Sequence, residues 1–366
     1  MLNFFNLQPE TFGIDISDSS IIIMKLKKKG SQLKVAAFNE ARLKPGIIRS
    51  GRVKNQLGLI KTLQEAVNKV QGEKINKDYA VLGLSEEKSF FQILKMPIMK
   101  KEDLENAIRF EAENYIPIPL HKVYLSFQVI SSPSPKQDFL EVLTTAVPKE
   151  IVDSYVVCFK KAGIKIKAIE VDSLAITRAL MKEGDVSGPI FIIDLGRNRT
   201  GFIIFENNSL RLTSSIPICG QRFTEILSRA LEIDIKKAEK IKNEYGLKNP
   251  EKVVLKAKKN SKSFKKEILC QERIFEALTP ALTDFVEQTR NYLDFYSKEV
   301  KKIILCGEGA NLKGFSNFLS LELKIPTESG NPWINISEEI QMPLEKSLKY
   351  VIAIGLALRG VKKVKS

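Results

Sequence analysis

The chain has 366 residues and a formal net charge of +15; 43% of its residues are hydrophobic and 28% are charged. This apolar content excludes a disordered chain, and the length exceeds what a single core usually supports, so we expect two domains. No apolar run approaches the roughly 18 residues of a membrane-spanning helix, and one histidine with four scattered cysteines argues against zinc sites and disulfide frameworks.

Strands and helices alternate along the first part of the chain. Residues 11–38 are typical of two or three strands joined by tight turns, and residues 79–84 of a short buried strand. The spacing of apolar residues predicts helices over residues 56–70 and 101–115, the second of which ends before Pro117.

A loop rich in serine and proline at residues 131–135 precedes a second set of elements. These are a strand over 139–147, a helix over 149–162 that Gly163 closes, a strand over 164–169 and a helix over 173–181. Residues 184–189 then form the expected boundary between two halves of the chain.

The second half repeats the opening pattern of strands and turns and then becomes mainly helical. We expect strands over 190–194, 201–205, 210–215 and 302–306, and helices over 223–231, 235–245, 271–297, 314–323 and 350–358. Strands with intervening helices in two similar halves predict an α/β protein with a cleft between the halves.

Two segments about 180 residues apart share one motif, an apolar strand that ends in an aspartate and a tight polar turn. The first contains Asp15, Ser19 and Ser20, and the second contains Asp194, Gly196 and Thr200. An aspartate beside hydroxyls and backbone N–H groups can hold a phosphate and its magnesium ion. Alone, either aspartate could simply cap a turn; the repetition favours two hairpins that close on one nucleotide.

These segments, together with the glycine turn after residues 302–306, resemble the actin, sugar-kinase and chaperone ATPase superfamily. The flanking sequence is similar to the cell-division FtsA family and especially to the type IV pilus assembly PilM family. The segments that carry this likeness are residues 111–117, 146–149, 161–163, 215–220, 238–242, 291–296 and 353–358. The resemblance implies two actin-like domains, residues 1–188 and 189–366, with an FtsA-type inserted subdomain at about 85–166 and a smaller subdomain at about 222–298.

The resemblance also implies ATP and Mg2+ in the central cleft. Asp15, Ser19 and Ser20 would form the first phosphate hairpin and Asp194, Gly196 and Thr200 the second, with Asp15 and Asp194 at the metal. Glu170 would orient the attacking water. Gly220 would approach the nucleotide, Glu239 and Lys242 would meet the ribose or base, and Gly307, Gly309 and Ala310 would line the adenine pocket.

Several of these residues have simpler interpretations, and the first hairpin departs from the family pattern. Glu239 and Lys242 could be a solvated ion pair, and Glu170 could be structural. Asp18 adds a negative charge near the expected phosphates, and Ile22 replaces an expected lysine, which Arg197 or Arg199 could partly supply. We therefore expect ATP binding with weak or no hydrolysis.

The function that the resemblance implies is an ATP-binding scaffold of the type IV pilus inner-membrane platform. Its partner would be the cytoplasmic N-terminal tail of PilN, in a groove for which residues 93–97 and 113–119 are candidates, although both could equally be packing between subdomains. Other platform proteins and motor ATPases are further candidate partners. The alternatives are an FtsA-like filament-forming ATPase, the equivalent protein of a type II secretion system, and a small-molecule kinase, for which no acceptor motif is present.

Lysine-rich stretches at residues 25–29, 252–266 and 362–365 carry much of the positive charge. Because the lysines alternate with apolar or acidic residues, a solvated surface is the simplest interpretation, and the inner face of a membrane is a better candidate partner than nucleic acid. We expect a cytoplasmic protein that associates with the inner membrane through its partner.

Overall fold

The computed structural model describes residues 10–30, 32–76, 79–130, 138–182, 184, 188–247, 262–336 and 344–361. The predicted loop at 131–135, residues 185–187 of the expected boundary, and the lysine-rich stretches at 252–261 and 362–365 lie outside these ranges. Within them, no helix combines the length and the apolar character needed to cross a membrane.

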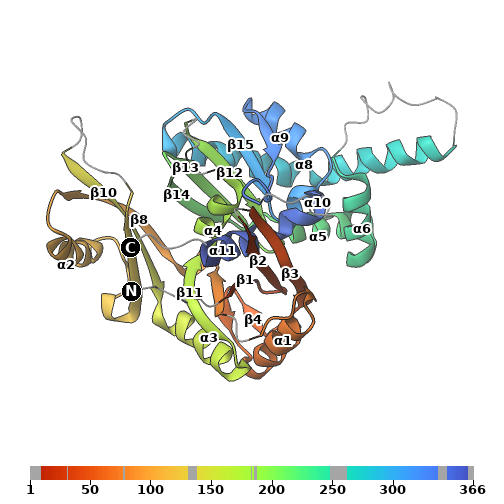
Figure 1. Ribbon diagram of the computed structural model, residues 1–366. Coiled ribbons are helices and arrows are strands. Elements are labelled where there is room, and N and C mark those ends of the chain that lie inside the picture. The colour runs from red at the N-terminus through yellow and green to blue at the C-terminus, as the bar shows by residue number, and fades with distance from the viewer. Residues whose placement is uncertain are drawn as a thin grey trace.

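Two large sheets share one plan, which confirms the predicted α/β, actin-like duplication (Figure 1). In each, three strands form an antiparallel meander whose first strand also pairs in parallel with a later strand. The first sheet contains β1 (Thr11–Ile16), β2 (Ser20–Lys29), β3 (Gln32–Arg42), β6 (Gln71–Gly72), β7 (Tyr79–Leu84) and β11 (Lys165–Val171). The second contains β12 (Ile190–Leu195), β13 (Thr200–Glu206), β14 (Ser209–Ile216), β15 (Lys302–Cys306) and β16 (Thr327–Ser329).

Two helices, α4 (Asp172–Leu180) and α11 (Val351–Val361), form a layer between the sheets. Their apolar residues share one core with the inner faces of β2, β12 and β13. The helices lie very close together at Gly355, where a Cβ atom would lie only 1.9 Å from the Ala175 carbonyl oxygen. Helix α11 therefore packs against the first sheet although it follows the second sheet in the chain.

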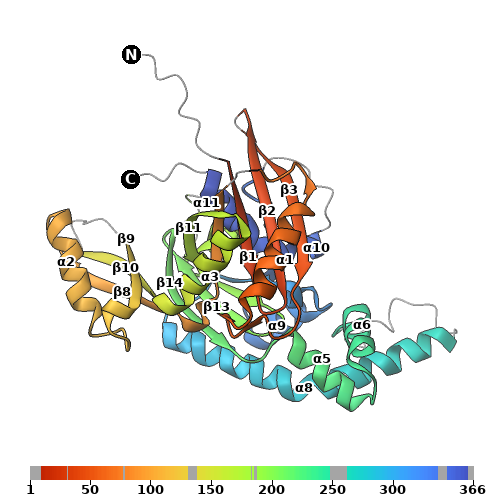
Figure 2. The same cartoon turned by 90° about the horizontal axis from the view of Figure 1, so that it is seen from below.

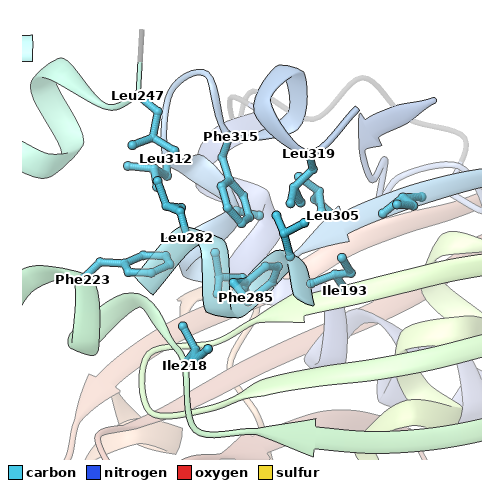
Figure 3. Close-up of a cluster of buried hydrophobic side chains, with 14 of the residues drawn as sticks. Ile193, Ile218, Phe223, Leu247, Leu282, Phe285, Leu305, Leu312, Phe315 and Leu319 are labelled. Atoms are coloured by element: carbon cyan, nitrogen blue, oxygen red, sulfur yellow. The ribbon is translucent and has the colours of Figure 1, made fainter. Parts of the chain in front are cut away.

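Helices also cover the outer face of each sheet (Figure 2). On the first sheet lie α1 (Gln56–Asn68), capped by the Asn55 side chain, and α3 (Lys149–Ala162). On the second lie α5 (Gly220–Ala230), α8 (Lys262–Tyr296) and α9 (Phe315–Leu323), and α6 (Ile235–Tyr245) packs on α5 and α8 beside the sheet. Figure 3 shows the core of this second outer layer, in which Phe285 and Phe315 make an edge-to-face contact with ring centroids 5.5 Å apart.

A small three-stranded sheet extends from the first half of the chain. It consists of β8 (Phe90–Pro97), β9 (Val123–Val129) and β10 (Phe139–Pro148), covered by α2 (Lys101–Ala112). Helix α3 instead packs into the core of the first large sheet. The small sheet and α2 lie within the range of about 85–166 that the resemblance implies for an inserted subdomain, and the bounds of that subdomain stay a prediction.

Short elements complete the described part of the chain. They are the hairpin of β4 (Ile48–Arg49) and β5 (Arg52–Val53), the helix α10 (Leu344–Ser347), and the 3-10 turns η1 (Glu86–Lys88), η2 (Leu120–Lys122), η3 (Glu308–Asn311) and η4 (Leu348–Tyr350). The strand at 79–84 and the helices at 149–162 and 235–245 have the predicted bounds. The helix predicted over 101–115 ends at Ala112, and α8 begins at Lys262, before the predicted start at 271.

Candidate functional site

The alternation of side chains along β1 and β12 turns Asp15 and Asp194 toward the space between the sheets. On β1, Phe12, Ile14 and Ile16 belong to the outer core, so Asp15 faces inward. On β12, Phe191, Ile193 and Leu195 belong to the other outer core, so Asp194 also faces inward. Successive side chains on a strand point to opposite faces, and therefore each hydrophobic pattern fixes the direction of its aspartate.

Both aspartates line one cavity of about 400 Å³ between the halves of the chain. The first half contributes the polar turn that follows β1, and the second contributes the turns that follow β12 and β15. Of the predicted site residues, the lining includes Asp15, Ser19, Ser20, Asp194, Gly196 and Gly307. It also includes Asp18, Asp172, Arg197 and Arg199.

In the first hairpin, two residues depart from the pattern of the resembling families, Ser17 in place of the usual glycine and Asp18, and both have partners within the protein. The Ser17 hydroxyl oxygen accepts the backbone N–H groups of Ser19 at 3.3 Å and Ser20 at 3.0 Å. The Asp18 carboxylate accepts the backbone N–H groups of Ser50 at 2.7 Å and Gly51 at 3.1 Å. Two backbone donors thus stabilise the Asp18 charge, which reduces its expected repulsion of a phosphate.

In the second hairpin, Arg199 connects the two halves across the cavity. Its guanidinium donates to the Asp172 carboxylate at 3.0 Å, and Asp172 is the first residue of α4. Burial disfavours the Arg199 cation, but Asp172 and Asp194 outweigh this effect and raise the pKa of Arg199 above its ordinary value. The cation expected from the position of Ile22 is therefore present in this cavity as Arg199.

Thr200 does not face the cavity. Its side chain is fully buried, and its hydroxyl donates to the Ile218 carbonyl oxygen at 2.5 Å. This hydrogen bond joins the start of β13 to the segment that follows β14.

The glycine turn after β15 approaches Asp194 more closely than any side chain would allow. Gly307 has φ +84°, and a Cβ atom there would lie 2.5 Å from Asp194 Oδ1 and 2.7 Å from the Leu195 carbonyl oxygen. The Cys306 thiol lies 3.8 Å from the same Asp194 oxygen, so this buried cysteine contacts the site. A residue without a side chain at 307 keeps the aspartate accessible.

The residues predicted for the ribose and the base lie next to the cavity but do not line it. Lys242 is buried and donates to the Gly220 carbonyl oxygen at 2.9 Å, to Thr224 Oγ1 at 2.8 Å and to Glu239 at 2.9 Å. The Cα atom of Gly309 lies 3.7 Å from where a Gly220 Cβ would be, and Ala310 is buried in the second outer core. Glu239 and Lys242 therefore join α5 to α6, and they are not the solvated pair considered above.

Glu170 lies in the middle layer away from the cavity. Its carboxylate binds Arg178 of α4, at 2.5 Å and 3.0 Å, and Arg359 of α11 at 2.5 Å. Its side chain is only 2% exposed, and both arginines come from helices that pack between the sheets. The structure thus gives Glu170 a structural role and places Asp172, two residues later, at the cavity.

Three of the four aspartates that line the cavity, Asp15, Asp172 and Asp194, form a buried acidic cluster beside the half-buried Arg199. Burial and the neighbouring Asp172 and Asp194 raise the pKa of Asp15 well above its usual value, and burial also raises the pKa of Asp194. Burial raises the pKa of Asp172 to about 7 despite Arg199, and its Oδ1 atom has no hydrogen-bond partner among the described residues. A divalent cation would compensate these charges better than protons do.

The donor set fits Mg2+ that is shared with a phosphate and does not fit a metal held by protein alone. In the described ranges, no group of three or more histidine, cysteine, aspartate or glutamate side chains has the arrangement of a metal centre. Mg2+ typically binds one or two carboxylates and completes its octahedron with phosphate oxygens and water. Asp15 and Asp194 could supply those carboxylates.

The raised pKa of Asp172 predicts that the nucleotide-free protein becomes more stable when the pH is lowered. A carboxyl with a pKa of about 7 in the folded protein and 3.8 as its ordinary value holds a proton in the folded state that the unfolded state releases. Lowering the pH from about 8 to about 6 should therefore raise the free energy of unfolding by about 1 kcal/mol. Urea titrations at the two pH values would measure this difference.

The matched variant for this measurement is Asp172→Asn, which cannot titrate. Between the two pH values, the change in its free energy of unfolding should be about 1 kcal/mol smaller than the change in the original protein. An identical pH dependence in both proteins would show that Asp172 does not titrate between about pH 6 and about pH 8 and would contradict the prediction.

A family model described as type IV pilus assembly protein PilM matches residues 13–361 of the chain. Curated relatives include two proteins described as cell division protein FtsA. The one from Neisseria meningitidis serogroup B is 32% identical over 90 residues, which are 25% of this chain and 22% of the relative. The one from Bacillus subtilis is 30% identical over 109 residues, which are 29% of this chain and 25% of the relative. The chain thus matches about a quarter of the length of each.

Solved structures share the fold over nearly the whole chain. One described as the PilM-PilN type IV pilus biogenesis complex has a TM-score of 0.79 and 22% identity, and covers 97% of this chain and 99% of that one. MreB5 of Spiroplasma citri, in a structure described as bound to ADP, has a TM-score of 0.53 and 11% identity, with 96% of each chain covered. At these identities the likeness shows the actin-like fold.

Proposed function

The chain belongs to the type IV pilus assembly protein PilM family, and from this membership we propose that it is a nucleotide-binding scaffold of a type IV pilus assembly platform. The observation that carries the proposal is that Asp15 and Asp194, from two duplicated hairpins, line one cavity between the halves. This arrangement suits a nucleotide whose binding draws the two halves together, and a protein that changes shape with its ligand can regulate a partner.

The nucleotide in this proposal is ATP with Mg2+. The bound metal would neutralise phosphate charge, and Asp15 and Asp194 would be its carboxylate partners. Ser19 and Ser20 from the first half and the turn at Gly196 from the second line the same cavity and would contact phosphate oxygens. Gly220, Glu239, Lys242, Gly309 and Ala310 lie next to this cavity, where the proposal places the ribose and the base.

Arg199 is the proposed phosphate-binding cation. It now pairs with Asp172, so a phosphate group that bound Arg199 would compete with that carboxylate. Release from Arg199 would leave Asp172 free to hold a water molecule, the role that the resemblance gave to Glu170. Because this ion pair must break first, the proposal predicts slow turnover at most.

The proposed partner is the N-terminal tail of PilN, the protein that is bound to PilM in the similar complex. A groove of about 490 Å³ lies where the inserted sheet meets α3, and its lining includes Arg109, Glu113, His121, Tyr124, Leu125 and Lys149. It lies at the start of β9, which is one of the two edge strands in the order β8-β10-β9. An extended peptide can add to such an edge and place side chains in adjacent pockets.

The two segments predicted for the groove differ in their positions. Residues 113–119 contribute Glu113 to the groove lining. Residues 93–97 do not, because Leu94 and Met96 are buried in the core of the inserted subdomain, with exposures of 2% and 4%. This second segment is therefore packing between and within subdomains, the simpler of its two interpretations.

A short segment between β7 and β8 could couple the nucleotide cavity to the inserted subdomain. Ser85 and Glu87 line the nucleotide cavity, and Glu86 and Glu87 line a second cavity of about 240 Å³ at the base of β8. The Glu86 carboxylate accepts a hydrogen bond from Ser173, the residue after Asp172. A ligand that moves Asp172 would thereby move the start of β8.

Binding of a synthetic peptide with the sequence of the PilN tail tests the proposal. We expect the peptide to bind the full chain, with an affinity that differs between Mg-ATP and no nucleotide. Leu125→Glu should weaken binding at least about tenfold, because it places a charge in the partly apolar groove. Isothermal titration calorimetry would measure both effects.

The matched control is Gln128→Glu on the same strand, since Gln128 is exposed and does not line the groove. It should bind the peptide as the unchanged protein does. No association of peptide and protein, with and without ATP, would contradict the proposal.

A filament-forming ATPase is the second candidate, because several curated relatives are described as cell division protein FtsA. Electron microscopy of the protein with Mg-ATP distinguishes the two, since filaments would favour this candidate.

A further inference from the structure

The starts of three parallel strands bring many lysines to one end of the first sheet. Thr11 of β1 pairs with Tyr79 of β7, and Tyr79 pairs with Lys165 of β11, so these strands begin side by side. The nucleotide cavity lies at their other ends, beside Ile16, Ser85 and Asp172. Because β2 runs antiparallel to β1, its last residues also lie at the end where the parallel strands start.

This end, which we call the basic pole, is formed by exposed lysines from four parts of the first half. They come from the tip of β2, the segment before β7, the last turn of α3 and the start of β11. The residues of the basic pole are Lys27, Lys28, Lys29, Lys74, Lys160, Lys161, Lys165 and Lys167.

Few carboxylates are paired with these lysines. Lys27 lies 3.1 Å from Glu73 and 3.9 Å from Glu10. Lys165 lies over the Tyr79 ring, 5.6 Å from its centroid, and Lys167 donates to the Gly360 carbonyl oxygen at 3.4 Å. The pole therefore keeps a large positive charge after its ion pairs are formed.

The end of the last helix adjoins the basic pole. A Cβ atom at Gly360 of α11 would lie 2.1 Å from the Thr11 hydroxyl, and Figure 2 shows the end of α11 on the same side as the tip of the β2–β3 hairpin. The described part of the chain thus brings the start of β1 and the last turn of α11 to the end of the sheet that carries the basic pole.

We propose that the basic pole docks directly on a bilayer that carries anionic phospholipid headgroups. All eight residues of the pole are lysines, whose ammonium groups act as point charges without the fixed fork of arginine. Such charges suit a mobile layer of headgroups better than phosphates held at fixed positions, as in nucleic acid. Each lysine near an anionic leaflet adds to the attraction, so a cluster of this size binds measurably.

The position of the pole is compatible with the proposed partner groove. Lys149, the first residue of α3, lines that groove, and Lys160 and Lys161 at the other end of the same helix belong to the pole. A helix of 14 residues is about 21 Å long, so groove and pole are that far apart along α3. A partner anchored in the membrane could thus place a cytoplasmic tail in the groove while the pole touches the bilayer.

Vesicle flotation with the full chain tests the proposal. The unchanged protein should float with vesicles of phosphatidylglycerol and phosphatidylethanolamine, less at high salt, and should not float with phosphatidylcholine vesicles. The triple variant Lys28→Gln, Lys29→Gln, Lys161→Gln should lose on the order of 100-fold in apparent affinity. These three side chains are exposed, so the variant should fold, which a thermal melt would check.

The matched control removes the same charge elsewhere. Lys236→Gln, Lys237→Gln, Lys240→Gln changes three exposed lysines of α6 on the second half, and its vesicle affinity should stay within about threefold. Equal losses in the two triple variants would overturn the pole as a distinct surface. Protein that binds duplex DNA but no anionic vesicles would overturn the membrane as its partner. Peptide binding to the groove is a separate measurement and would be unchanged in either case.

Discussion

Replacing Glu170 by Gln should lower the free energy of unfolding by about 3 kcal/mol or more while nucleotide affinity stays within a few-fold of its original value. The change leaves Arg178 and Arg359, which are 25% and 33% exposed, without the shared carboxylate that joins α4 to α11. Removing one partner of a buried ion pair is costly because the remaining charge loses its compensation. Chemical denaturation monitored by circular dichroism would measure the loss.

Glu150→Gln is the matched control for this prediction. Glu150 pairs with Arg52 at the surface, with a side-chain exposure of 74%, and the loss of such a pair should cost under about 1 kcal/mol. A Glu170→Gln variant that is as stable as the original protein but no longer hydrolyses ATP would contradict this prediction. It would support the catalytic role that the resemblance implies for Glu170.

Asp194→Asn should strongly weaken Mg-ATP binding. The substitution removes one of the two proposed carboxylate partners of the metal. A charge-assisted contact of this kind contributes up to about 3 kcal/mol, or about 150-fold in affinity, so a loss of about 10- to 150-fold is expected. Because burial raises the pKa of Asp194, the ionised carboxylate is unfavourable in the empty cavity, and the nucleotide-free variant should be at least as stable at pH 8. Titration with a fluorescent ATP analogue would measure the affinity.

Asp18→Asn controls for a general change of charge in the same cavity. Asp18 accepts two backbone N–H groups of the β4–β5 turn, so its loss should destabilise the turn and leave Mg-ATP affinity within about threefold. Chelation of Mg2+ should bring the affinities of Asp194→Asn and the original protein together. A difference that persists without metal would show that Asp194 acts on the nucleotide directly.

The fold and the centre of the site could be predicted because short-range patterns determine them. The alternation of side-chain directions along the strands at residues 11–16 and 190–195 determines which way each aspartate points. The repeat of the hairpin implied a shared cleft. Helices with clear ends, such as α3 before Gly163, were predicted at their observed bounds. The family resemblance placed these elements in the right order.

Two predicted site residues that do not line the cavity, Glu170 and Thr200, have hydrogen-bond partners later in the chain. Glu170 binds Arg359, which is 189 residues later, and Thr200 binds the carbonyl group of Ile218. The strands at 90–97 and 123–129 were not predicted, because the first carries core residues on both faces and the second is an outer strand with a weak hydrophobic pattern. Asp18 was expected to add a repulsive charge near the phosphates, because its backbone partners in the β4–β5 turn could not be seen in the sequence.

The position of α11 has a consequence for how the protein folds during its synthesis on the ribosome. This helix supplies part of the inner covering of the first sheet, yet it is translated after the whole second sheet. During synthesis, the inner face of β1, β2 and β7 must remain partly uncovered while about 180 further residues emerge after β11. A nonsense mutation just before Val351 would therefore destabilise mainly the N-terminal half, because its sheet would lose the covering helix. Chaperones and proteases would be expected to act on such a product.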